Sequence, residues 1–257
     1  MRKSKVLEKW RRGEFARFCA LGHVLPFFIR YAAHYGYDGI WLDLEHRNMD
    51  DREVQHLLAL CQMFDIDCMV RPPTLQRSRL YRYLEDGATG LMIPFVSTAE
   101  IARDLVTAVR FPPLGNRGLD GAGLDCQFGI ESWAPGSNYP EDANRETFIV
   151  AQIETPEAVN NAAEVAAVPG IDALFIGPGD LGLRLSVEPT DMTMEDAVEK
   201  VAAAAQQHGK VWARTASSIE ELDRYRAMGA QMVPWGGDFA LMKVLEKASQ
   251  ELDNVLI

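Results

Sequence analysis

The 257-residue chain lacks the features that mark several large classes of protein. It has no apolar run of about 18 residues, the length that a membrane-spanning helix needs. Its basic N-terminus has no apolar stretch of the kind found in secretory signals, so we expect a cytoplasmic protein. The four cysteines form no C-x-x-C pair. Three of them lie in apolar segments, and we therefore expect reduced, structural thiols.

Positive charge is also scarce. Lys and Arg number 26 against 37 Asp and Glu, which gives a net charge of -11. Such a surface repels nucleic acid and anionic membranes, so we expect neither as a partner. A small anionic substrate is still compatible, because a few cations in a cleft can outweigh distant charges that salt screens. The chain is 47% hydrophobic and 25% charged, values that are typical of folded globular proteins.

Eight short apolar runs alternate with longer amphipathic segments along the chain. Strand-helix alternation requires parallel strands, and eight units in about 250 residues predict a (β/α)8 TIM barrel of the α/β class, with one domain over residues 1–257. An open dinucleotide-binding sheet is the alternative, but no G-x-G-x-x-G opens a helix. The predicted strands are 15–20, 39–44, 66–70, 90–95, 148–153, 173–176, 211–213 and 232–234. The predicted helix caps include Asp50 or Asp51, Thr98, Thr155, and Ser218 in a capping box with Glu221.

One stretch, residues 111–145, interrupts this alternation and is rich in Gly, Pro and Asn. Loops of this length are usually functional or disordered. Its GNRGLDGAG segment is typical of a backbone-rich binding loop. A surface excursion that packs on a neighbouring subunit is an equally good interpretation, and the sequence does not choose between them.

Parallel barrels carry their chemistry at the carboxyl ends of the strands. Asp43 and His46 follow the second run, where the acid can orient the imidazole as a proton relay. Arg71 ends the third run, where its guanidinium could hold a carboxylate or stabilise an enolate oxygen. The alternative for Arg71 is a buried ion pair with Asp43 or Glu45. The remaining histidines are interpreted as structural: His23, His34, His56 and His208.

Two carboxylates, Glu154 and Asp180, follow neighbouring predicted strands. Such a pair suits a divalent cation that keeps open positions, Mg²⁺ or Mn²⁺ rather than structural zinc. The alternative is that each acid only caps the helix that follows it. Gly177 and Gly179 permit close approach of a ligand, and the N–H groups of Gly179 and Asp180 favour a substrate carboxylate. Lys210 precedes its strand, so a metal route is favoured over a Schiff base.

The motifs LDLEH, VRP, QIE and GPGDL, in this order, and the segment 86–118 resemble the HpcH/HpaI family of metal-dependent class II pyruvate aldolases. The type activity there is that of 4-hydroxy-2-oxoheptanedioate aldolase. The resemblance implies reversible cleavage of 4-hydroxy-2-oxo acids to pyruvate, or a related 2-oxo acid, and an aldehyde. It implies a divalent ion held by Glu154 and Asp180, with Co²⁺ or Zn²⁺ as alternatives to Mg²⁺ or Mn²⁺. Pyruvate would chelate that ion, with Arg71 beside the developing enolate.

The same resemblance implies that Asp43 and His46 form the dyad that manages protons, and that Gln152 positions the bound ligands. It also implies a homohexamer whose last helix, within residues 239–256, packs on a neighbouring subunit. The chain departs from the family at Leu44, where Gly is frequent, and at Arg47 and Asn48, where a small residue and proline are commoner. These departures leave the aldehyde open.

Two other functions remain compatible with the same residues. The first is a citrate-synthase-like condensing enzyme of the same superfamily, which would act without added metal. The second is a non-catalytic barrel that binds a 2-oxo acid, since site and fold are separable.

Overall fold

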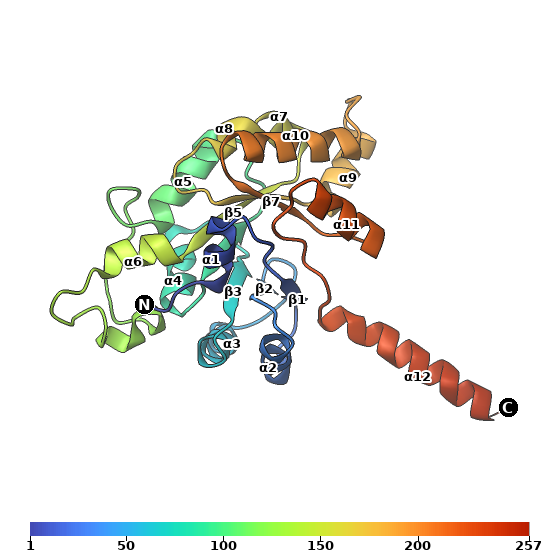
Figure 1. Ribbon diagram of the computed structural model, residues 1–257, viewed down its shortest axis with the longest axis horizontal. Coiled ribbons are helices and arrows are strands. Elements are labelled where there is room, and N and C mark those ends of the chain that lie inside the picture. Colours follow the sequence, from blue (N-terminus) through green and yellow to red (C-terminus); the bar gives the residue numbers. More distant parts are fainter. Residues whose placement is uncertain (257) are drawn as a thin grey trace.

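The computed structural model describes residues 1–256, which form an α/β fold around one parallel sheet (Figure 1). Seven strands lie side by side in chain order, and every neighbouring pair is parallel. This confirms the predicted class and the first seven predicted strands. The strands are β1 (Phe18–Leu21), β2 (Gly39–Asp43), β3 (Asp67–Arg71), β4 (Gly90–Ile93), β5 (Phe148–Ile153), β6 (Ala173–Ile176) and β7 (Val211–Arg214).

The eighth predicted strand, 232–234, consists of isolated bridges within the described residues. Met232 forms parallel bridges with both Ala16 and Ala213, and Gly237 bridges Ala20. The segment therefore runs between the two edges of the curled, TIM-like sheet without forming a regular ladder. Pro234 explains part of this, because it has no N–H to donate. Gly236 explains more, because its φ of 85° is incompatible with a continuous strand.

Helices follow the strands and flank the sheet, with α5, α7, α8 and α10 along one side and α2 and α3 along another (Figure 1). Asp50, Thr98 and Thr155 cap their helices as predicted. Ser218 also caps its helix, but Glu221 accepts from the N–H of Ser217, so the predicted capping box is not formed. The helices are α1 (Lys5–Arg11), α2 (Pro26–His34), α3 (Asp51–Met63), α4 (Arg77–Glu85), α5 (Ala99–Val109), α6 (Tyr139–Glu146), α7 (Pro156–Asn160), α8 (Ala162–Ala166), α9 (Pro178–Val187), α10 (Met194–Gln207), α11 (Ile219–Ala227) and α12 (Leu241–Leu256), with short 3-10 turns η1 (Leu124–Gly129) and η2 (Asp238–Ala240).

The apolar core has two layers, one on each face of the sheet. Along β5, Ile149 and Ala151 pack outward against the helices, whereas Phe148 and Val150 belong to the inner cluster. Helix α1 contributes to this inner cluster, with Trp10 edge-on to Phe148 at a centroid distance of 5.1 Å. Side chains along a strand alternate between the two faces of a sheet. A residue two positions after a member of the inner cluster is therefore expected to point inward as well.

The stretch 111–145 is ordered around a buried polar group of three residues. Tyr139 donates from its hydroxyl to Asp125 Oδ2 at 2.7 Å, and Arg117 Nη2 lies 3.3 Å from the same oxygen. Burial raises the pKa of the Asp125 carboxyl, against the opposing effects of Tyr139 and Arg117. Gln127 and Phe128 adopt left-handed backbone conformations within η1. These contacts join distant parts of the stretch to one another.

Two further observations concern the expectations from composition. None of the helices in residues 1–256 combines the length and the apolar character that a bilayer crossing requires. All four cysteines are free and buried, as predicted. Burial raises the pKa of the Cys19 thiol to about 12, which keeps it protonated near neutral pH.

Candidate active site

Alternation along the strands places the predicted polar residues at the carboxyl end of the sheet interior. Inner-cluster residues are followed, two positions later, by polar residues or glycine on the same face. These successive pairs are Met69 and Arg71, Val150 and Gln152, and Phe175 and Gly177.

Arg214 does not follow this pattern of inward-facing residues. Ala213 belongs to the inner cluster, so the next residue points to the outer face. The guanidinium of Arg214 lies 5.0 Å from the ring centre of Tyr225, which is on α11. Arg214 therefore stands at a strand end without contributing to the group of residues inside the sheet.

Asp43 and Arg71 form a bidentate ion pair across neighbouring strands. Arg71 Nε donates to Asp43 Oδ1 at 2.9 Å, and Nη2 donates to Oδ2 at 2.8 Å. The strand register sets these two residues side by side. Burial alone would raise the pKa of Asp43, but the hydrogen bonds and charge of Arg71 hold it below its usual value. The buried ion pair, considered from the sequence as an alternative for Arg71, is therefore present.

The predicted contact between Asp43 and the imidazole of His46 is not formed. Asp43 Oδ1 instead accepts the backbone N–H groups of Glu45 and His46, at 3.1 and 3.4 Å. Both oxygens of this carboxylate accept hydrogen bonds from Arg71. Glu45 is the acid near that ring: its Oε2 lies 3.6 Å from His46 Nε2 and 3.2 Å from Arg71 Nη1. Sequence reasoning gave Glu45 no role of its own, although its spacing of two from Asp43 was a usable signal.

Glu154 is a buried carboxylate at the end of β5, with 3% of its surface exposed. Gln152 donates to its Oε1 at 3.0 Å, and the N–H of Phe95 donates to Oε2 at 3.1 Å. Phe95 has a φ of 54°, in the left-handed region that a bulky residue rarely adopts. Burial raises the pKa of Glu154 to about 7, and the charges of Glu45 and Asp180 act in the same direction.

Gly177 leaves the space that the Glu154 carboxylate occupies. A Cβ at this position would lie 2.2 Å from Glu154 Oε1 and 2.8 Å from its Cδ. Any side chain there would therefore displace the carboxylate. From the sequence we predicted that Gly177 permits the close approach of a ligand. In the structure, it permits the close approach of the Glu154 side chain.

Asp180 lies in the first turn of α9, which begins at Pro178. The first N–H groups of a helix have no partner within the helix, and they favour an anion. A Cβ at Gly179 would meet open space, so the surface over this turn is accessible. Burial is the main cause that raises the pKa of Glu45 and of Glu154, and the charge of Asp180 acts in the same direction on both.

The donor set fits a hard divalent cation. Burial, together with neighbouring carboxylates, raises the pKa of Glu45 and of Glu154, and the Oε1 atom of Gln152 is buried without a hydrogen-bond partner among the described residues. Oxygen acceptors thus outnumber donors, which suits Mg²⁺ or Mn²⁺. No group of three or more His, Cys, Asp or Glu side chains in residues 1–256 is arranged to hold a metal ion.

Lys210, the lysine considered from the sequence for a Schiff base, lies away from this group of residues. Lys210 lies at the amino end of β7 and donates from Nζ to the carbonyl of Ile171 at 2.8 Å. It therefore stands at the opposite end of the sheet from Glu154, as the sequence predicted.

A second histidine, which we interpreted as structural from the sequence, forms a carboxylate pair at the same end of the sheet. His23 follows β1, and its Nδ1 lies 2.6 Å from Oδ2 of the buried Asp238. The two residues are 215 positions apart in the chain, so spacing gave no signal for their contact.

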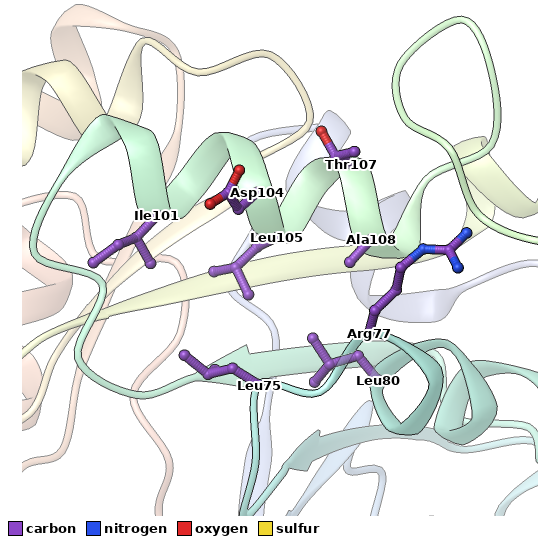
Figure 2. Close-up of a pocket in the computed structure, with 8 residues that line it drawn as sticks. All are labelled: Leu75, Arg77, Leu80, Ile101, Asp104, Leu105, Thr107 and Ala108. Atoms are coloured by element: carbon purple, nitrogen blue, oxygen red, sulfur yellow. The ribbon is translucent and has the colours of Figure 1, made fainter.

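A separate cavity of about 410 Å³ lies between α4 and α5 (Figure 2). Ile101, Leu105 and Ala108 of α5 face Leu75 and Leu80 across it. None of the predicted site residues lines this cavity. It belongs to the outer helical layer rather than to the candidate site.

Comparison with known proteins identifies the family of this chain. A 2-keto-3-deoxy-L-rhamnonate aldolase of Klebsiella pneumoniae is 30% identical over 240 residues, 91% of this chain and 84% of that protein. A hydroxypyruvate/pyruvate aldolase of Delftia acidovorans is 32% identical over 224 residues, covering 86% and 82% of the two chains. The crystal structure of an HpcH/HpaI aldolase from Desulfitobacterium hafniense superposes with a TM-score of 0.85 at 31% identity, over 95% of each chain. The sequence model of the HpcH/HpaI aldolase/citrate lyase family matches residues 22–243, and the chain belongs to that family.

Proposed function

We propose that the protein is a divalent-metal-dependent lyase that reversibly cleaves 4-hydroxy-2-oxo acids to pyruvate, or a related 2-oxo acid, and an aldehyde. The observation that carries this proposal is the buried Glu154, whose pKa rises to about 7 through burial and neighbouring carboxylates. Such a group is unfavourable as an anion until a cation joins it. Similarity to aldolases for 2-keto-3-deoxy-L-rhamnonate and for hydroxypyruvate and pyruvate supports the reaction class.

Cleavage of the bond beta to a ketone leaves electrons that the ketone must accept. A divalent cation held by Glu154 and Asp180 would supply a Lewis acid for this purpose, with Mg²⁺ or Mn²⁺ as the favoured ions. Gln152 fixes one oxygen of Glu154, and Phe95 fixes the other. These two contacts hold the carboxylate in a single orientation before any ligand arrives.

Arg71 is positioned to stabilise negative charge that develops on the substrate. Asp43 holds two of its nitrogens, and Glu45 lies near the third. The guanidinium also stacks over Trp41, with a centroid distance of 4.9 Å. A cation fixed in this way needs little reorganisation when charge appears on an enolate oxygen.

His46 is the group we assign to proton transfer. Its side chain is 54% exposed and lies beside Glu45 rather than Asp43. An imidazole is a suitable group for general acid-base chemistry because one ring nitrogen can donate a proton while the other accepts one. In this proposal, Asp43 positions Arg71 and the turn that carries His46. The N–H groups of Gly179 and Asp180 bind the substrate carboxylate at the start of α9.

We also propose that α12 packs on a neighbouring subunit of a homohexamer. The helix projects away from the rest of the chain (Figure 1). Its apolar side chains are exposed, including Val244, Leu245, Leu252 and Val255. Apolar area of this kind is stable in water when a partner covers it.

The exchange of pyruvate methyl protons with deuterated water tests the proposed function, because exchange requires only the enolate half of the reaction. We expect exchange in the presence of Mg²⁺ or Mn²⁺, and loss of exchange in the Glu154→Gln variant. Glu157→Gln is the matched control, since it makes the same chemical change at an exposed position three residues away. If the wild-type protein gives no exchange with Mg²⁺, Mn²⁺, Co²⁺ or Zn²⁺, the proposal is overturned and a binding protein is favoured.

A further inference from the structure

The turn after β4 contains a strained residue whose backbone contacts the candidate site. Phe95 has a φ of 54°, a left-handed conformation that is unfavourable for a residue with a bulky side chain. It follows Pro94, and in turns of this kind the left-handed position after proline is usually taken by glycine. The N–H of Phe95 nevertheless donates to Glu154 Oε2 at 3.1 Å, and the next N–H, of Val96, donates to the carbonyl of Gln152 at 3.1 Å. The strained backbone therefore directs an N–H at one of the two proposed metal ligands.

A guanidinium from α9 lies over the ring of Phe95. The Cζ atom of Arg184 is 5.5 Å from the ring centre, within the range of a cation–π contact. Arg184 Nη1 pairs with Glu188, at the end of the same helix, at 3.2 Å. Its Nε is buried and has no acceptor within residues 1–256. The Phe95 ring is thus the partner that connects this guanidinium to another part of the fold.

The contact between Arg184 and Phe95 spans the strand end that carries Glu154. The turn of Phe95 follows β4, α9 follows β6, and Glu154 follows β5, which lies between these two strands in the sheet. Arg184 and the other proposed ligand, Asp180, lie four residues apart on α9 and therefore on the same side of the helix. The contact joins the helix of one proposed ligand to the turn that holds the other.

We infer that Arg184 is a positioning residue for the proposed metal site: its guanidinium holds the Phe95 ring and so keeps the N–H of Phe95 directed at Glu154. The inference rests on the proposed function and adds a residue that acts through Phe95 rather than on the cation. A cation–π contact offsets the unfavourable backbone conformation, which a glycine would adopt without such support.

The sign of the effect distinguishes this role from simple electrostatics. Arg184 is a cation, so if only its charge mattered, its removal should strengthen the binding of a dication nearby. A positioning role predicts the opposite, because Glu154 loses the fixed orientation that favours a bound cation.

Calorimetric titration of the full-length, chelator-treated protein with Mn²⁺ tests the inference. We expect Arg184→Gln to raise the Kd for Mn²⁺ by about tenfold. Phe95→Leu keeps a bulky residue in the strained conformation but has no ring, and it should raise the Kd by a similar factor. Phe95→Gly keeps the N–H and adopts the left-handed conformation freely. In the Phe95→Gly background, Arg184→Gln should therefore change the Kd by less than about twofold.

Arg214→Gln is the matched control, and we expect it to leave the Kd unchanged. The guanidinium of Arg214 also lies over an aromatic ring, at 5.0 Å from the ring centre of Tyr225, and its buried Nε also has no acceptor in the described part of the chain. Arg214 differs in that it points to the outer face. An Arg184→Gln variant that binds Mn²⁺ as tightly as wild type, or more tightly, would overturn the inference. An equal loss of affinity in Arg214→Gln, or in the Phe95→Gly background, would also overturn it.

Pyruvate exchange separates this inference from the proposed function. If the Mn²⁺ affinities follow the expected pattern while the wild-type protein gives no exchange, the proposed function is wrong and the positioning role stands. If exchange succeeds while the affinities do not follow the pattern, only the positioning role is wrong. If the wild-type protein does not bind Mn²⁺, both are wrong.

Discussion

Removal of metal should make the stability of this protein depend on pH through Glu154. Burial raises the pKa of this carboxyl from 4.5 to about 7. The shift corresponds to about 3 kcal/mol, at about 1.4 kcal/mol for each pKa unit. Between these two pH values the folded state binds more protons than the unfolded state, so the free energy of unfolding falls as pH rises. The contribution of Glu154 is complete below pH 4.5 and is lost above about pH 7.

Urea denaturation of chelator-treated protein from pH 5 to 8 measures this effect. Other buried carboxyls also titrate, so the informative quantity is the difference between wild type and Glu154→Gln. We expect wild type to lose about 2 to 3 kcal/mol relative to the variant across this range, because the amide has no proton to release. Saturating Mg²⁺ or Mn²⁺ should remove the difference in slope, since a bound cation stabilises the carboxylate. Parallel profiles for the two proteins in chelator would refute the reasoning.

Three further changes test separate parts of the structure. Gly177→Ala puts a Cβ 2.2 Å from Glu154 Oε1, so we expect metal affinity, measured by calorimetry, to fall about tenfold or more. Gly182→Ala, in the helix that follows Gly177, makes only an ordinary contact at 3.7 Å and should retain the affinity. Tyr139→Phe leaves a buried Asp125 oxygen without its closest donor and should cost about 1–3 kcal/mol of unfolding free energy, whereas Tyr35→Phe at an exposed site should cost nothing measurable. Deletion of residues 241–257 removes the projecting α12 and should reduce the mass measured by light scattering to that of smaller assemblies; an unchanged mass would contradict the proposed role of the helix.

The sequence was sufficient to predict those parts of the site that depend on local spacing. Gln152 and Glu154 follow two inward-facing residues of β5, so their direction is a consequence of strand alternation. The position of Lys210 was also predictable, because this residue directly precedes its strand.

For contacts between strands, the sequence offered alternatives but could not choose among them. The ion pair of Arg71 with Asp43 was one of these alternatives, and it forms because the register of β2 and β3 sets the two residues side by side; nothing local to either strand fixes that register. The His46 ring consequently loses its expected acid partner and lies near Glu45. The contact of His23 with Asp238 depends on the first and last parts of the sheet meeting. In contrast, the irregular eighth segment had a local signal in Pro234.

The position of the metal ion is the most direct test of the account. Crystals soaked with Mn²⁺ and oxalate, an enolate mimic, should give an anomalous difference peak within bonding distance of the carboxylates of Glu154 and Asp180, about 2 to 2.5 Å. The oxalate should occupy the remaining positions, with Arg71 beside it. A peak bound elsewhere, or no peak although the oxalate is ordered at the strand ends, would contradict a mechanism built on these two acids.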